Sequence, residues 1–122
     1  MATFNATIDG VTQKIRIVVI HAKSGGDADG YIRRQYDVKL LKDSLDYFYP
    51  NDKVILIGDY NDRMVTSIFT GHPSSYQPYV NDNVNYNILT YPLDQAGRTS
   101  FPSSNGLIDH VTITSEFAKL ES

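Results

Sequence analysis

Two short, almost uninterrupted apolar runs constrain this chain of 122 residues more than any other feature. Ile15–Ile20 is apolar apart from Arg16, and Val54–Ile57 is apolar throughout. Strands with one solvated face have alternating sequences, whereas strands buried on both faces have continuous apolar sequences. We therefore expect two strands whose faces both require cover.

A helix is predicted between these two runs. From Tyr31 to about Tyr49 apolar side chains recur at helical spacing, and Pro50 ends the pattern. The recurring apolar positions are Val38, Leu41, Leu45 and Phe48. Strands joined by one long crossover helix indicate a mixed α/β layer structure. One helix of this length can cover only one face of the sheet, so the other face has no partner in the pattern.

Turn signals divide the rest of the chain into shorter elements. Phe4–Ile8 alternates and precedes Asp9-Gly10, a strong signal for a two-residue hairpin, so Val11–Ile20 is the expected return strand. Residues 63–85 are rich in Asn, Ser, Pro and Tyr and indicate a long loop with a short helix near Val65–Phe69. The remaining expected elements are a strand at Tyr86–Tyr91, a turn at Pro92–Arg98, a tight connection at Ser103–Gly106 and a strand at Leu107–Thr114.

Polar side chains occur at the ends of the expected strands. His21 follows the first apolar run, Asp59 and Asn61 follow the second, and Asp109 opens the last strand. In extended chain, residues i and i+2 point to the same side, so Asp59 and Asn61 could face one ligand together. A carboxylate beside a carboxamide suits phosphate chemistry, because the acid handles a proton or a metal and the amide hydrogen-bonds an oxygen. Ordinary turn chemistry can produce the same pattern.

Three motifs in this order resemble the endonuclease/exonuclease/phosphatase superfamily, the metal-dependent phosphoesterases typified by pancreatic deoxyribonuclease. The matching segments are His-Ala-Lys-Ser-Gly at 21–25, Gly-Asp-Tyr-Asn-Asp at 58–62 and Ile-Asp-His-Val at 108–111. Arg34 and Gln35 in the helix pattern also fit. The resemblance implies an α/β (α+β) fold: a partial four-layer α-β-β-α sandwich of the deoxyribonuclease type, with a mixed sheet and one main helix.

Two family features are absent from the sequence. The chain's two glutamates, Glu116 and Glu121, both follow the last motif, so neither can be the metal-binding glutamate that the family carries on an N-terminal strand. The family's final Ser-Asp-His motif is also missing, and His110 belongs to the strand before it, so we interpret His110 as structural or peripheral. We therefore expect residues 1–122 to be a single domain that forms the middle-to-late portion of a phosphoesterase domain.

The resemblance implies a role for each candidate residue. Asp59 would orient or activate the attacking water and form a weak, incomplete metal site. Asn61 would hydrogen-bond a phosphate oxygen, and His21 would donate to phosphate or act as a general acid. Asp109 would orient the catalytic histidine, and Lys23 would line the phosphate pocket. The structural alternatives are a turn or cap for Asp59, an Asx-turn for Asn61, a loop histidine for His21 and a solvated lysine for Lys23.

The function implied is hydrolysis of a phosphodiester or phosphomonoester by water, with Mg²⁺ or Mn²⁺ in the complete parent domain and only weak metal binding by this chain. The substrate expected is a phosphoester, nucleic acid included, although the net charge of −3 gives no basic footprint for nucleic acid. A non-catalytic module of the same fold is the competing hypothesis. Sequence does not separate nuclease from inositol, lipid or sugar phosphatase.

The pattern also bears on partners and on the remaining polar and aromatic residues. We expect no signal peptide and no membrane span within this chain, an expectation that does not extend to the parent protein. The uncovered sheet face predicts a homodimer, and the alternative is that Phe4–Ile8 folds over part of this face. Arg34 is expected as a helix-surface charge and His72 as a loop residue. The tyrosines at positions 76, 79, 86 and 91 would either pack the long loop down or form a stacking platform for bases or sugars.

Overall fold

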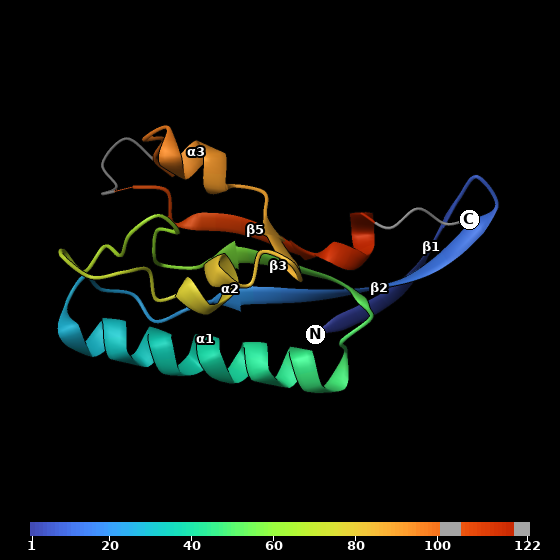
Figure 1. Ribbon diagram of the computed structural model, residues 1–122, viewed down its shortest axis with the longest axis horizontal. Coiled ribbons are helices and arrows are strands. Elements are labelled where there is room, and N and C mark those ends of the chain that lie inside the picture. The colour runs from blue at the N-terminus through green and yellow to red at the C-terminus, as the bar shows by residue number, and fades with distance from the viewer. Residues whose placement is uncertain (101–105, 119–122) are drawn as a thin grey trace.

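The computed structural model describes residues 1–100 and 106–118 and shows one mixed β-sheet with its main helix on one side (Figure 1). The sheet order is β1-β2-β3-β5-β4, with β2 and β3 parallel and the other neighbours antiparallel. The strands are β1 (Ala2–Ile8), β2 (Val11–His21), β3 (Lys53–Asp59), β4 (Tyr86–Ile88) and β5 (Asp109–Thr114). The helices are α1 (Ala28–Phe48), α2 (Gln77–Asn81), α3 (Tyr91–Gln95) and the 3-10 helix η1 (Ser115–Ala118).

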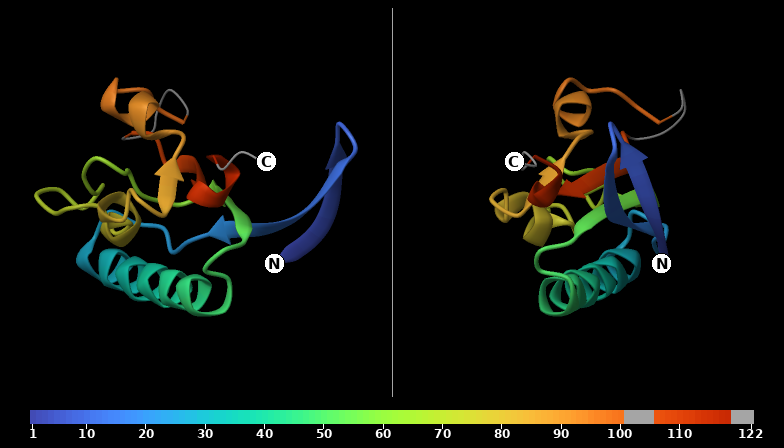
Figure 2. Two further views of the ribbon diagram at one scale, coloured as in Figure 1. Left: turned by 45° about the vertical axis from the view of Figure 1, so that its right-hand side comes forward. Right: turned by 90° about the vertical axis from the view of Figure 1, so that its right-hand side faces the viewer.

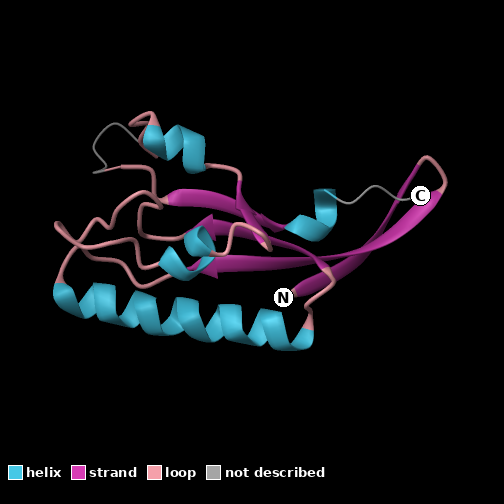
Figure 3. Ribbon diagram, in the orientation of Figure 1, coloured by secondary structure: helices cyan, strands magenta, loops and turns pink. Residues whose placement is uncertain are grey.

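The N-terminal hairpin agrees with its prediction. Asp9 and Gly10 have φ values of 52° and 81°, the left-handed conformations that a tight two-residue turn requires. β1 pairs with the first part of β2, and the second part of β2 pairs with β3. The hairpin therefore projects from the body of the molecule as an arm of two strands (Figures 1 and 3).

Helix α1 connects the two parallel strands, as predicted, and begins where Asp27 accepts a hydrogen bond from the Gly30 N–H at 2.9 Å. Val38 and Leu45 are buried and Leu41 is partly buried. Phe48, the last position of the apolar pattern, is 67% exposed. The helix ends at Phe48. Tyr31 and Arg34, nearer its start, are also buried.

The core lies between α1 and one face of the sheet. Residues that point to that face alternate along the strands, and Val54 and Leu56 of β3 and Thr112 of β5 are almost completely buried. The tyrosines of the loop and of β4 (Tyr76, Tyr79 and Tyr86) close this core, with Tyr79 and Tyr86 in edge-to-face contact at 4.9 Å. The packing role predicted for these tyrosines is confirmed.

The opposite face of the sheet carries no helix among the described residues, and the right-hand view of Figure 2 shows α1 and α2 on one side only. We expected both faces of the apolar strands to be covered. In the structure one face is covered and the other is open. Val19 is 76% exposed and Ile57 is 41% exposed, and both point to the open face. No helix in the described part of the chain is long and apolar enough to cross a membrane.

The structure differs from the predictions at 65–69, in the length of the strand that begins at Tyr86, and at the turn expected from Pro92. Residues 65–69 form no helix, and α2 lies further along the loop at Gln77–Asn81. The predicted strand Tyr86–Tyr91 is only three residues long, because Tyr91 already begins α3 where a turn was expected. The expected tight connection at Ser103–Gly106 falls mostly outside the described residues.

Candidate active site

Three of the predicted site residues occupy neighbouring positions on three adjacent strands. His21 of β2 pairs with Asp59 of β3, and Asp59 pairs with Asp109 of β5. Directly paired residues of neighbouring strands project from the same face of a sheet. The three side chains therefore form one row at the end of the open face.

Asp59 and Asp109 of this row lie directly opposite each other on neighbouring strands. The Tyr60 N–H donates to the Ile108 carbonyl oxygen at 2.8 Å, so the next pair inward, Asp59 and Asp109, is not hydrogen-bonded through its backbone. Opposite Cβ atoms in such pairs are about 4.5–5.5 Å apart. A shallow hollow of about 360 Å³ lies over them, lined by Ile57, Gly58, Asp59, Asp109, His110 and Val111. Asp59 and Asp109 therefore place two carboxylate side chains at this end of the open face.

Asn61 reaches the same end of the sheet by a turn, not by strand alternation. Its φ of 51° is left-handed, and its N–H donates to Asp59 Oδ1 at 2.9 Å. Its amide Nδ2 donates to the Ala22 carbonyl oxygen at 2.8 Å, and the Ala22 N–H donates to the Asp59 carbonyl oxygen at 3.0 Å. The 58–62 motif is therefore held directly against the 21–25 motif, although the extended geometry expected for Asp59 and Asn61 was wrong.

Gly58 permits this close approach of the two strands. Its φ is +139°, and a Cβ added to it would lie 2.3 Å from the Ile20 carbonyl oxygen. The residue before Asp59 thus cannot carry a side chain without moving the backbone of β2.

Arg34 and Asp62 are buried side chains that hydrogen-bond to the loops next to the site. Neither role was predicted from the sequence. Arg34 was expected on the helix surface, but it is completely buried and its Nη1 donates to the carbonyl oxygens of Lys23 at 2.9 Å and Gly25 at 2.7 Å. Its spacing from Tyr31 and Val38, three and four residues away, is the core spacing of the helix and could have revealed this.

Asp62 is also fully buried, and its carboxylate binds the loop that follows the 58–62 motif. Its carboxylate accepts hydrogen bonds from the backbone N–H groups of Ile68 at 2.7 Å and Ser75 at 2.9 Å, and from the hydroxyl groups of Ser67 and Ser75. These bonds replace helical hydrogen bonds in residues 65–69, which is why the short helix expected there does not form.

His110 is structural, as predicted. It is 2% exposed, and its Nδ1 lies 2.6 Å from the Thr90 hydroxyl. Its Nε2 lies 2.8 Å from the Leu107 carbonyl oxygen and 3.0 Å from that of Asp62, so Nε2 carries the proton and Nδ1 accepts from Thr90. Burial lowers the pKa of the imidazole, against the smaller opposing effect of these carbonyl oxygens. The ring lies beneath the candidate site, on the covered face.

The other two predicted polar residues are both exposed. The Lys23 side chain is exposed in the loop after β2, and only its backbone is held by Arg34. His72 is an exposed loop residue, as predicted, stacked on Phe69 with ring centroids 4.1 Å apart.

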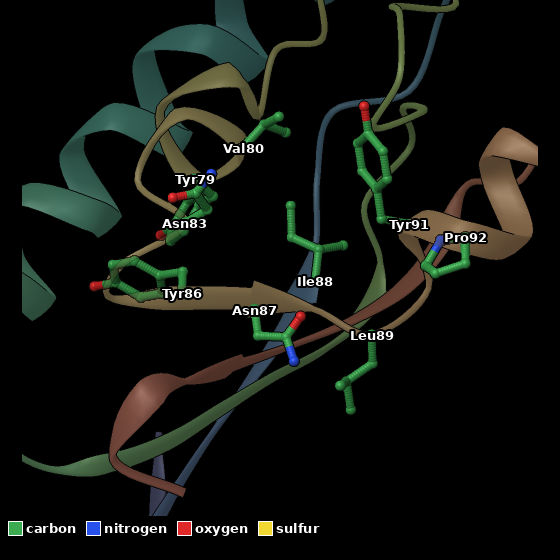
Figure 4. Close-up of a pocket in the computed structure, with 9 residues that line it drawn as sticks. All are labelled: Tyr79, Val80, Asn83, Tyr86, Asn87, Ile88, Leu89, Tyr91 and Pro92. Carbon is green, nitrogen blue, oxygen red and sulfur yellow. The ribbon is translucent and has the colours of Figure 1, made fainter. Parts of the chain in front are cut away.

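A second hollow of about 610 Å³ lies away from this row, between α2, β4 and α3 (Figure 4). Tyr79, Ile88 and Tyr91 are among its lining residues. The Tyr79 hydroxyl group is buried and has no hydrogen-bond partner among the described residues. Tyr79 and Tyr86 are buried in the core. The accessible polar groups at this hollow are therefore the Tyr91 hydroxyl and the side-chain amides of the lining asparagines.

The residues present do not complete a metal site. Among the described residues, no group of three or more His, Asp or Glu side chains is placed to hold a metal ion. Asp59 and Asp109 offer oxygen ligands, but one Asp59 oxygen already accepts the Asn61 N–H. Mg²⁺ prefers a nearly complete octahedral set of oxygens. The row therefore fits part of a metal site and not a whole one.

Comparison with known proteins supports the fold. No protein-family model matches the sequence, and no curated protein matches it. Among solved structures, the catalytic domain of human Nocturnin, determined with a bound sulfate anion, is similar with a TM-score of 0.54 and 16% sequence identity. The match covers 92% of this chain and 39% of the Nocturnin chain. The α/β fold of the deoxyribonuclease type is confirmed, and the chain spans about 39% of that neighbour's length.

Proposed function

We propose that this chain carries the phosphate-binding part of a phosphoesterase active site. The observation that supports the proposal is the row of His21, Asp59 and Asp109 on adjacent strands, with Asn61 hydrogen-bonded to the same strand end. Rigid strand ends commonly hold catalytic side chains, and these residue types are the ones that phosphoester hydrolysis uses.

In this proposal water attacks phosphorus and forms a new P–O bond, the ester P–O bond breaks, and the leaving alcohol takes a proton from His21 as general acid. Asp59 orients the water and accepts its proton, while His21 and Lys23 meet the negative charge of the phosphate oxygens. Asp109 holds a histidine supplied from outside the described residues, in the manner of carboxylate–histidine pairs. Mg²⁺ or Mn²⁺ would supply further positive charge in a complete domain, with additional ligands that the described residues do not provide.

A phosphate titration followed by NMR tests the proposal without requiring turnover. Inorganic phosphate is added in the presence of Mg²⁺, and we expect the largest shifts at His21, Lys23 and Asn61. Asn61→Ala should weaken these shifts, whereas Asn81→Ala, on the surface of α2, should leave them unchanged. Shifts located elsewhere, or none at tens of millimolar phosphate, would reject the phosphate site.

The isolated chain should show no appreciable phosphodiesterase activity, because the metal set and the second histidine are not among its described residues. Plasmid DNA and a chromogenic phosphodiester are suitable substrates, assayed with Mg²⁺ or Mn²⁺. Robust turnover that is lost in Asp59→Ala would show that the chain is catalytically complete. The expectation that the chain belongs to a longer domain stays a prediction.

The second candidate function is a non-catalytic binding or assembly module of the same fold. It is favoured by one observation, the incomplete set of metal-ligating side chains in the described residues. The phosphate titration separates the two functions, because a module without a phosphoester site has no reason to bind phosphate at His21 and Asn61.

A further inference from the structure

The open face of the sheet is a continuous apolar surface that reaches from the arm to the candidate site. Large exposed apolar side chains from four segments point to this face. They are Phe4 of β1, Val11 and Val19 of β2, Ile57 of β3 and Leu89 after β4, each at least 41% exposed. The partly buried Ile17, Ile55, Val111 and Ile113 lie between them. A contiguous apolar surface of this kind marks an interaction site.

The arm is a second sign that a partner covers this face. β1 pairs only with β2, and its other edge carries no strand among the described residues. A two-stranded hairpin is marginally stable in water without a third strand or a packed face. The arm therefore requires a surface to pack against, and its apolar residues Phe4 and Val11 belong to the open face.

The size of the face suits a dimer. A spacing of about 4.8 Å between strands and about 3.3 Å between residues gives the five strands a projected area of roughly 500 Å². The accessible area of a side-chain surface exceeds its projection, so the face approaches the roughly 800 Å² per partner found in specific interfaces.

The acidic end of the face favours one way of stacking two copies. A twofold axis that lies between the faces and crosses the strands near the middle of β3 stacks the strands antiparallel. Asp59 and Asp109 of the two copies then lie at opposite ends of the interface, so their negative charges do not meet.

We propose that two copies of this chain pack their open sheet faces together about a twofold axis, with Val19 and Ile57 central to the interface and the arm of each copy extending past the candidate site of the other. The proposal does not depend on the phosphoesterase function. It assigns the open face to a second copy, and other occupants are outcomes of the test.

Sedimentation equilibrium of the full chain at micromolar concentration tests the interface. We expect a dimer for the unchanged chain, and a dissociation constant raised roughly 30-fold or more by Val19→Asp, the change expected when a central interface contact is lost. Val84→Asp is the matched control, because Val84 is 77% exposed and Val19 is 76% exposed, and Val84 lies off the sheet. Val19→Thr, which keeps the side-chain shape, should also weaken the dimer if Val19→Asp fails to fold.

A competing surface lies on the outer side of α1, where Ile32, Tyr36 and Leu40 are each more than half exposed. A dimer that Leu40→Asp disrupts and Val19→Asp leaves intact would overturn the proposal. So would a monomer at every concentration, because the open face would then need no second copy.

Discussion

Arg34 and Asp62 form an ion pair in which neither side chain is exposed, with 3.8 Å between Arg34 Nε and Asp62 Oδ2. The guanidinium holds the backbone of the 21–25 motif, and the carboxylate holds the loop that follows the 58–62 motif. Arg34 Nε and Nη2 have no hydrogen-bond partner among the described residues, so Asp62 supplies the compensating charge. The two motifs are thus connected beneath the candidate site by one buried pair.

Replacing Asp62 should strongly destabilise the protein. Asp62→Ala removes the hydrogen bonds of the loop and leaves the Arg34 guanidinium buried without a counter-charge, which costs about 3–5 kcal/mol of unfolding free energy. Urea unfolding measures the change. Asp43→Ala is the control, since Asp43 pairs with Lys39 on the exposed surface of α1, and surface pairs contribute about 0–1 kcal/mol. Equal losses in the two variants would contradict the structural role of the buried pair.

Gly58→Ala should also destabilise the fold, because the new Cβ would collide with the Ile20 carbonyl oxygen. Gly71→Ala is a matched control: Gly71 also has a positive φ, +86°, but no atom lies within 4 Å of its added Cβ. We expect the control to lose about 1–2 kcal/mol from backbone strain alone, and Gly58→Ala to lose clearly more. Thermal or urea unfolding decides this, and similar losses would show that β2 moves aside without cost.

The stability of the protein should fall as the pH is lowered through the range in which His110 titrates. Burial lowers the pKa of His110 in the folded state below its ordinary value of 6.5. The unfolded chain then binds more protons below about pH 6.5, so unfolding is favoured there and the stabilisation is present above that pH. Urea unfolding between pH 7.5 and 5 measures the slope.

Two variants assign this slope to its source. His110→Gln should flatten it, at the cost of some overall stability, whereas the exposed His72→Gln should leave it unchanged. A slope that persists in His110→Gln would mean that other groups dominate the acid sensitivity.

Mg²⁺ should bind the chain only weakly, in about the millimolar range or poorer, because Asp59 and Asp109 offer too few oxygens for a tight site. Isothermal titration calorimetry with Mg²⁺ measures the affinity. Asp59→Asn and Asp109→Asn should each reduce the residual binding, and Asp43→Asn should not. Micromolar affinity would show that a further ligand completes the site, with Asp62 the first residue to test.

The sequence alone determined the elements that local patterning specifies. The Asp9-Gly10 turn, the long helix before Pro50 and the two apolar strands follow from turn conformation and hydrophobic period, and they form where predicted. The order of the three motifs indicated the fold class that the structural comparison confirms. The positions of His21, Asp59 and Asp109 at strand ends also followed from the sequence, because each residue borders a run with the pattern of a strand.

Only the tertiary structure decided what depends on contacts between distant segments. Arg34 is buried because carbonyl groups nine and eleven positions earlier in the chain accept its hydrogen bonds. The helix expected at 65–69 does not form because five donors from the folded loop converge on the Asp62 carboxylate. The same holds for the sheet. Continuous apolar strands predict that both faces are covered, but which face α1 covers, and which stays open, is fixed by the register and order of the strands.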